Sequence, residues 1–254
     1  MKTKAAWALF LVLAIAGGLR GWSVYEYTQA HPLSGAPTID EASYDDWAVE
    51  ISGGEWRGEE VFFQEPLYPY FLGVIYSLVG RDLFIVRLLQ AALGVLTCWL
   101  VVKLGRRLGG DWAGIVAGLL FACLPSLVLL PCLLLKPNLH LPLFCALALL
   151  FTMPGPGGIR RWFLIGAVGG LCALLRGNSL VLLPVFFFCA VSVLPRGLPS
   201  VVRGFSFLLG AFILLAPIAW RNHEVGGVWA LTTSGAGTNI YGGNNLENPR
   251  GVAT

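Results

Sequence analysis

Long apolar runs dominate the chain from its N-terminus to residue 220. Short polar connections separate most of them, and one longer polar stretch follows the first run. A helix needs roughly 20 apolar residues to cross the hydrocarbon core of a bilayer, with about 17–25 tolerated. The pattern therefore predicts an all-α polytopic membrane protein. Seven transmembrane helices are expected, at residues 5–24, 83–102, 112–130, 132–152, 162–176, 179–194 and 201–220.

Residues 40–53 have the different pattern of an amphipathic helix that lies on a membrane surface. Thr38 and Glu41 have the spacing of a capping box, so Thr38 is the expected N-cap. Gly53 and Gly54 are expected to end the helix. One face is predicted to hold Asp40, Tyr44, Trp47 or Ala48, and Ile51, while Asp45, Asp46 and Glu50 point elsewhere.

A second short helix is predicted at residues 66–80. This segment is apolar, but it is short for a crossing and begins with two prolines, Pro66 and Pro69. We interpret it as a helix at the membrane interface. Both short helices are then juxtamembrane helices of the first outer loop, residues 25–82.

The charged residues predict which side of the membrane each loop occupies. Hydrophobic residues make up 56% of the chain and charged ones only 12%, against about 25% charged in soluble domains, and the mean hydropathy is +0.73. With the N-terminus in the cytoplasm, nine basic residues and one acid fall on the cytoplasmic side, as the positive-inside rule requires. The basic ones are Lys2, Lys4, Lys103, Arg106, Arg107, Arg160, Arg161, Arg196 and Arg203.

Nearly all acidic residues are then left on the outer side, where Asp40 is the main candidate for chemistry. A carboxylate in the first turn of a helix is favoured by the helix dipole and tends to stay ionised. This suits a general base that acts on a hydroxyl, or a ligand for a hard cation. The alternative is that Asp40 only caps its helix, and the spacing alone favours this alternative.

Basic residues near the outer membrane edge are the second group of candidates, because several that converge would bind an anion such as a lipid phosphate. For Arg20 and Arg81 we favour snorkelling to lipid headgroups. For Lys136 and Arg176, which lie beside prolines or glycine within apolar runs, an anion site and snorkelling are equally open. The whole group is Arg20, Arg81, Arg87, Lys136, Arg176 and Arg221.

Other kinds of site find no support in the sequence. The chain has no P-loop and no G-x-S-x-G nucleophile motif, and its three histidines lack a metal-ligand spacing. We therefore expect no cofactor and no nucleic-acid partner, although a divalent cation is compatible with the acidic outer loop.

Short motifs follow one another along nearly the whole chain. They are Asp40-x3-Tyr44-x3-Ala48, Gly53-Gly54-Glu55-Trp56, Pro66-Leu67-Tyr68-Pro69-Tyr70-Phe71-Leu72, Arg87-Leu88-Leu89-Gln90, Gly105-Arg106-Arg107-Leu108-Gly109, Leu175-Arg176-Gly177-Asn178, Pro217-x3-Arg221-Asn222 and Tyr241-Gly242-Gly243-Asn244-Asn245. In this order they resemble the dolichyl-phosphate-mannose-protein mannosyltransferase-like family. The family belongs to the C-type glycosyltransferase superfamily, together with the aminoarabinose transferase of lipid A.

The resemblance implies a bacterial membrane glycosyltransferase. Its donor would be a sugar linked to a polyprenyl phosphate, and its acceptor a hydroxyl of a protein, lipid or glycan on the outer face of the inner (cytoplasmic) membrane. Asp40 would be the catalytic base in a transfer that inverts the anomeric carbon. Four further residues would bind the lipid phosphate or substrate: Tyr44, Lys136, Arg176 and Arg221.

The chain is expected to hold a membrane-embedded catalytic module at residues 1–220 and the start of a truncated extracytoplasmic segment at 221–254. A fragment of this kind could be inactive by itself. Two other functions stay open. A flippase or transporter for a lipid-linked glycan would need charges along a path through the bilayer, and a non-catalytic assembly subunit would be indifferent to the loss of Asp40.

Overall fold

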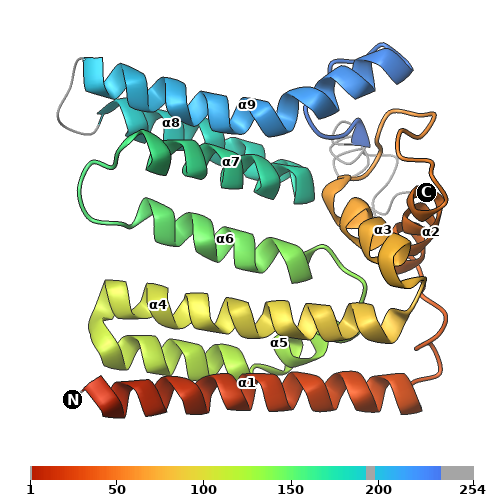
Figure 1. Ribbon diagram of the computed structural model, residues 1–254, viewed down its shortest axis with the longest axis vertical. Coiled ribbons are helices and arrows are strands. Elements are labelled where there is room, and N and C mark those ends of the chain that lie inside the picture. Colours follow the sequence, from red (N-terminus) through yellow and green to blue (C-terminus); the bar gives the residue numbers. More distant parts are fainter. Residues whose placement is uncertain (1, 193–197, 236–254) are drawn as a thin grey trace, which may run out of the picture. The chain divides into compact units, whose positions relative to one another are not determined.

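The computed structural model describes residues 2–192 and 198–235, and the regular structure in these residues is entirely helical (Figure 1). Two compact units form: residues 1–56 with 68–155, and residues 57–67 with 156–254. The elements are α1 (Lys2–Ala30), α2 (Asp40–Ser52), α3 (Leu67–Val79), α4 (Leu83–Cys123), α5 (Pro125–Leu129), η1 (Leu130–Cys132), α6 (Pro137–Phe151), α7 (Ile159–Leu175), η2 (Gly177–Val181), α8 (Leu182–Ser192) and α9 (Leu198–Gly226).

The expected all-α fold class is confirmed. Three helices of the described residues are long and apolar enough to cross a bilayer: Ala6–Ala30, Leu83–Cys123 and Pro199–Gly226. Shorter apolar helices lie at Leu67–Val79, Pro137–Phe151 and Gly177–Ser192. The count of seven crossings, and the side of the membrane on which each loop lies, stay predictions.

In the first unit, α4 folds back on itself at Gly110 and packs against α1 and α6 (Figure 1). Gly110 has a φ of 81°, a conformation that glycine adopts without strain. A Cβ on Gly114 would lie 2.6 Å from the carbonyl oxygen of Val102, so glycine is what lets the two arms approach this closely. The second arm ends at Cys123, several residues before the predicted end of its span.

The chain between Cys123 and α6 is irregular, and α6 begins at Pro137 rather than at residue 132 as predicted. Backbone N–H groups of the same segment reach some of its carbonyl oxygens, such as those of Leu130, Leu133 and Leu135. Three buried side chains of α4 and α6 also donate to carbonyl oxygens of this segment. Arg87 Nε donates to Cys132 O (2.9 Å), Gln90 Nε2 to Pro131 O and Leu133 O (2.9 and 3.1 Å), and Asn138 Nδ2 to Leu130 O, Leu133 O and Leu135 O (3.2, 3.0 and 3.2 Å).

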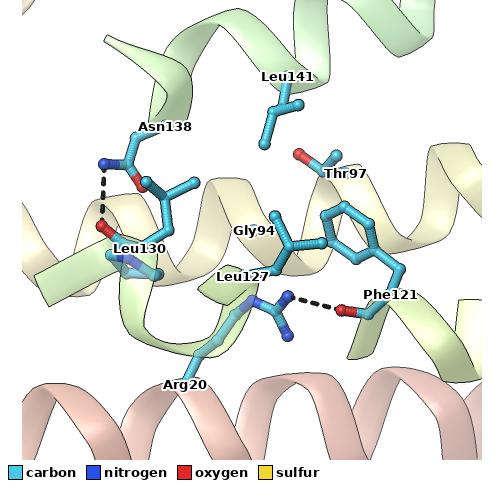
Figure 2. A pocket seen from close by; sticks show the side chains of 9 residues that line it. Arg20, Gly94, Thr97, Phe121, Leu127, Leu130, Asn138 and Leu141 are labelled. Atoms are coloured by element: carbon cyan, nitrogen blue, oxygen red, sulfur yellow. Dashed lines mark hydrogen bonds between the residues drawn. The ribbon is translucent and has the colours of Figure 1, made fainter. Parts of the chain in front are cut away.

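Arg20 is fully buried, so the interpretation that it snorkels to headgroups is wrong. Its guanidinium donates to the carbonyl oxygens of Phe121 and Ala122, at the C-terminus of the second arm of α4, at 3.2 and 3.4 Å. A cation is favoured at a helix C-terminus by the free carbonyls and by the helix dipole. Figure 2 shows the small cavity beside this contact, which Thr97 and Asn138 also line.

In the second unit, α7 packs along α9 through glycines on both helices. A Cβ on Gly166 would lie 2.0 Å from Phe207 O, and one on Gly210 would lie 2.1 Å from Phe163 O. The α7 helix ends at Leu175, one residue before the predicted end of its span, and a 3-10 turn, η2, leads into α8. Buried Arg203 of α9 donates to Ala190 O near the C-terminus of α8 (3.1 Å).

The two short helices of the first outer loop form within a residue or two of their predicted bounds, as α2 and α3. Gly53 is the C-cap of α2 and Gly54, at a φ of 109°, turns the chain away. The predicted capping box is wrong. The N-cap is Ile39, which makes no side-chain hydrogen bond to the first turn of the helix. The Glu41 carboxylate accepts a hydrogen bond from the backbone N–H of Leu134.

Candidate functional site

The α2 helix packs on α3 through the apolar part of its predicted face. Tyr44, Ala48 and Ile51 are buried, and a Cβ on Gly73 would lie 2.5 Å from Ile51 Cγ2, so α3 presents a glycine at the closest approach. Tyr44 meets Tyr68 edge to face, with ring centroids 5.4 Å apart. This packing fixes the side of α2 that faces the protein.

Asp40 stands at the first residue of α2, outside this packing. Its side chain is exposed and makes no hydrogen bond or ion pair with any residue that the structure describes. Ile39, immediately before it, has a φ of 55°, which is rare for a β-branched residue. Such strain is found mainly at functional sites. The carboxylate is thus held by the backbone and left free to meet a ligand.

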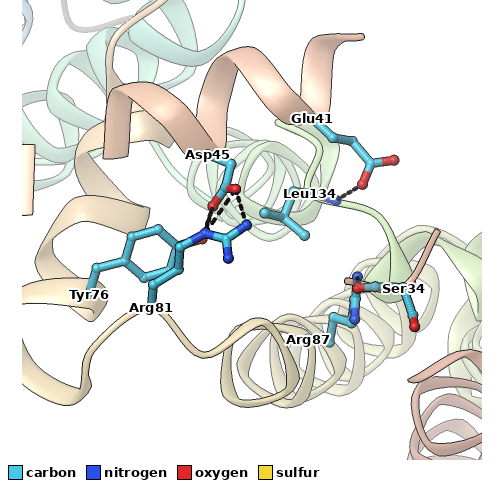
Figure 3. Close-up of polar contacts among 7 residues, drawn as sticks. All are labelled: Ser34, Glu41, Asp45, Tyr76, Arg81, Arg87 and Leu134. Atoms are coloured by element: carbon cyan, nitrogen blue, oxygen red, sulfur yellow. Dashed lines mark hydrogen bonds and ion pairs between the residues drawn. The ribbon is translucent and has the colours of Figure 1, made fainter. Parts of the chain in front are cut away.

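Glu41 joins the start of α2 to the irregular segment before α6. Its Oε2 accepts from the Leu134 N–H at 3.2 Å (Figure 3). Two residues further on, Lys136 places its Nζ 5.4 Å from the centre of the Tyr44 ring, within cation–π distance. Two of the predicted site residues, Tyr44 and Lys136, therefore lie together, one turn along α2 from Asp40.

Asp45 is buried and fully engaged, where the sequence pattern had it pointing away from the packed face (Figure 3). Arg81 donates to both of its carboxylate oxygens, with distances from 2.5 to 3.0 Å, and the Tyr76 hydroxyl donates to Oδ1 at 2.6 Å. These contacts raise the pKa of Arg81, chiefly through its hydrogen bonds to Asp45. Burial, and then the bond to Asp45, raise the pKa of Tyr76 above its usual value. Arg81 is therefore paired rather than snorkelling.

Arg176 belongs to the second unit, where it separates α7 from η2 and has an extended backbone. Its side chain is exposed. The next residue, Gly177, donates its N–H to the Glu65 carboxylate at 2.8 Å. The turn that carries Arg176 is thus anchored to the segment before α3, and its guanidinium points out of the packed protein.

Arg221, near the end of α9, is the most engaged of the candidates. Its guanidinium carbon lies 3.7 Å from the centre of the Phe62 ring, and its Nε donates to Arg57 O at 2.8 Å. Its neighbour Asn222 is fully buried and donates to Ala230 O at 3.0 Å. These contacts fasten the loop at residues 57–62 to α9, which gives Arg221 a structural role whatever else it does.

Asp40, Tyr44 and Lys136 thus belong to one unit, and Arg176 and Arg221 to the other. Their assembly into a single site stays a prediction. Within residues 2–192 and 198–235, no group of three or more His, Cys, Asp or Glu side chains gathers as metal ligands would. The motif at residues 241–245 lies outside the described residues.

The sequence pattern did not predict the contacts of Glu41 and Asp45. It placed Glu41 in a capping box and had Asp45 pointing away from the packed face. Their partners explain this, because Arg81 and Leu134 are 36 and 93 residues away. A buried aspartate can be suspected from sequence only when its counter-charge is near in the chain. For Asp45 no such local signal exists.

Comparison with known proteins gives one match. A model of the dolichyl-phosphate-mannose-protein mannosyltransferase family matches residues 64–220, more than half of the chain, from just before α3 into α9. No curated protein and no solved structure matched. The matched region includes Lys136 and Arg176, and begins after α2. With its apolar helices, the chain is a multi-pass membrane protein that belongs to the dolichyl-phosphate-mannose-protein mannosyltransferase family of glycosyltransferases.

Proposed function

We propose that this protein transfers a sugar from a polyprenyl-phosphate-linked donor to an acceptor hydroxyl, with inversion and with Asp40 as general base. The observation that carries the proposal is the contrast between Asp40, in the first turn of α2, and the two carboxylates closest to it on the helix; Asp46 and Glu50, further along α2, are exposed as Asp40 is. Glu41 and Asp45 are engaged with Leu134 and Arg81, whereas Asp40 is exposed and unengaged within the described residues. A general base must be free to accept a proton from its substrate.

The alternative that Asp40 only caps its helix loses its main support. Asp40 is the first residue inside α2, and the N-cap position is occupied by Ile39 without any side-chain hydrogen bond. A carboxylate that is exposed at the start of a firmly packed helix fits the role of a base better than that of a cap.

In the proposed reaction, Asp40 accepts the proton of the acceptor hydroxyl while the hydroxyl oxygen attacks the anomeric carbon. The bond from that carbon to the phosphate oxygen breaks, and its electron pair leaves with the polyprenyl phosphate. The leaving group gains negative charge, which a nearby cation stabilises. Attack opposite the departing phosphate inverts the anomeric carbon.

Of the three predicted phosphate-binding cations, Lys136 is the one that belongs to the same unit as Asp40. Its ammonium lies over the Tyr44 ring, next to the α2 helix that carries the base. The segment that holds it is fixed by Arg87, Gln90 and Asn138, so little reorganisation is needed when charge develops. Arg176 would be a second phosphate ligand, and Arg221 would contribute through the loop that it holds.

We further propose that the reaction takes place on the outer face of a bacterial inner membrane, with the N-terminus in the cytoplasm. The positive-inside distribution of the basic residues supports this orientation. It puts α2 and the segment around Lys136 on the side where lipid-linked sugars are used after they cross the membrane. No soluble nucleotide-sugar site is then needed.

The test is a donor panel. Membranes that carry the full-length protein are incubated with polyprenyl phosphates bearing different sugars, and the release of free polyprenyl phosphate is measured against membranes without the protein. Release with at least one donor, and an inverted product, is expected. No release with any donor from well-inserted protein would contradict the proposal, and would favour transport or assembly instead.

A further inference from the structure

Asp45 is the one carboxylate of α2 that is buried, with 4% of its surface exposed. It is held by Arg81 and Tyr76 through four short contacts. Arg81 lies in the turn after α3, and Tyr76 lies within α3. The cluster therefore joins α2 to both the body and the end of its neighbouring helix.

Stability alone does not explain this cluster. Burying a carboxylate costs its hydration, and a partner such as Arg81, whose side chain stays 43% exposed, offsets that cost without a large net gain over well-packed apolar residues. The interface already has an apolar contact in Tyr44, Ala48 and Ile51. Apolar contact is non-directional, so it selects the packed face of α2 but constrains the exact rotation and register of the helix less tightly than a hydrogen-bonded pair does. A two-pronged Arg–carboxylate pair fixes direction as well as distance.

We propose that Asp45 is a positioning residue for Asp40: its cluster with Tyr76 and Arg81 fixes the rotation and register of α2, and so the place of the base. This inference rests on the function proposed above. Asp40 lies five residues before Asp45, about 7.5 Å along the helix axis at 1.5 Å per residue. Since the Asp40 side chain contacts nothing among the described residues, only the α2 backbone sets its position.

Glu41 supplies the second point of attachment. Through Leu134 it ties the N-terminal turn of α2 to the segment that ends in Lys136. A helix attached at one point can still pivot about it, whereas two attachments together with the packed apolar face leave α2 much less freedom to move. With Asp45 holding one side and Glu41 the other, the base and the candidate cation keep a fixed separation.

The test compares Asp45→Asn and Tyr76→Phe with Asp46→Asn, an exposed neighbour that serves as the matched control. The full-length protein is used, and kcat and the donor KM are measured on the folded, monodisperse fraction. In Asp45→Asn we expect kcat to fall about tenfold to hundredfold, as for a displaced catalytic group, while the donor KM stays the same. Tyr76→Phe should give a smaller loss in kcat, because it keeps the ion pair.

A purely structural role would lower the yield of folded protein and leave kcat per folded molecule unchanged. Wild-type kcat in Asp45→Asn would therefore overturn the inference. Should Asp45→Asn fail to fold, Tyr76→Phe gives the same comparison, and an unchanged kcat in that variant counts equally against it.

Hydrogen exchange of the α2 amides gives a readout that needs no activity. Faster exchange across residues 40–52 in both variants, with α4 and α6 unchanged, supports the attachment even where no donor is turned over. If exchange is faster but no donor is turned over, the proposed function is contradicted, whereas the attachment of α2 through Asp45 is supported. Unchanged exchange in α2 would overturn the attachment itself, whatever the activity.

Discussion

At the scale of single residues, several buried polar side chains of the first unit donate to backbone carbonyl groups. Arg20 donates to the end of a helix arm, and Arg87, Gln90 and Asn138 donate to the irregular segment before α6. A buried backbone group left without a partner is costly, so such donors stabilise the segment before α6. That segment leads directly to Lys136.

Gln90 gives a direct test of this organisation. It accepts from the buried Tyr68 hydroxyl at 2.6 Å and donates to Pro131 O and Leu133 O. Replacing it by leucine leaves buried groups without partners, at about 1–3 kcal/mol each. We expect Gln90→Leu to lower the thermal unfolding midpoint of the detergent-purified protein clearly, and the half-exposed Leu89→Ala to change it little.

A double variant separates the lost hydrogen bond from a general packing defect. Gln90→Leu combined with Tyr68→Phe removes the orphaned hydroxyl, so the two changes together should cost less than the sum of the single changes. Strict additivity of the two unfolding free energies would show that the Tyr68–Gln90 bond is not what stabilises this region.

At the scale of helices, the existence of each helix was more predictable from sequence than the residues at which it ends or the distant residues that it contacts. The apolar runs and the Gly53-Gly54 stop predicted α2 and α3 within a residue or two, because period and chain reversal are local properties. The long helices were located, but their ends differ: α1 ends at Ala30 instead of residue 24, and α9 at Gly226 instead of residue 220. The start of α6 and the true N-cap of α2 were missed. Both depend on distant partners, in Asn138 and its carbonyls and in Glu41 with Leu134, which no local pattern shows.

The α7 and α9 helices pack closely because glycines lie at their contact. Gly166 of α7 faces the backbone of α9, with room for no Cβ, since one would lie 2.0 Å from Phe207 O. Gly166→Ala is therefore expected to force α7 and α9 apart and to destabilise the protein by about 1–3 kcal/mol or more. Thermal unfolding monitored by fluorescence measures this loss.

Gly18→Ala is the matched control, because a Cβ at Gly18 in α1 meets nothing within 4 Å. Alanine is the better helix former by about 1 kcal/mol, so this variant should be unchanged or slightly more stable. Equal unfolding midpoints for Gly166→Ala and the wild type would show that the close α7–α9 contact is not formed as described.

At the scale of the whole molecule, the family, the all-helical class and the membrane location followed from the sequence, through composition and motif order. The site itself stays a prediction. Spacing put Asp40 and Tyr44 on one helix face, but their roles and that of Lys136 rest on the resemblance to the family. The Asp45 cluster could be found only from the structure, because hydrophobic periodicity does not indicate a charge pair between α2 and the turn after α3.

The measurement that tests the account most directly is the rate of polyprenyl phosphate release by Asp40→Asn, with Asp46→Asn as the control. Both variants remove one exposed carboxylate from α2, so the two share any general effect of charge. Loss of a general base typically costs about 10²–10⁴-fold in rate. We expect a loss of this size in Asp40→Asn, normal membrane insertion, and wild-type release in Asp46→Asn. Equal release by Asp40→Asn and wild type would contradict the assignment of Asp40 as the base.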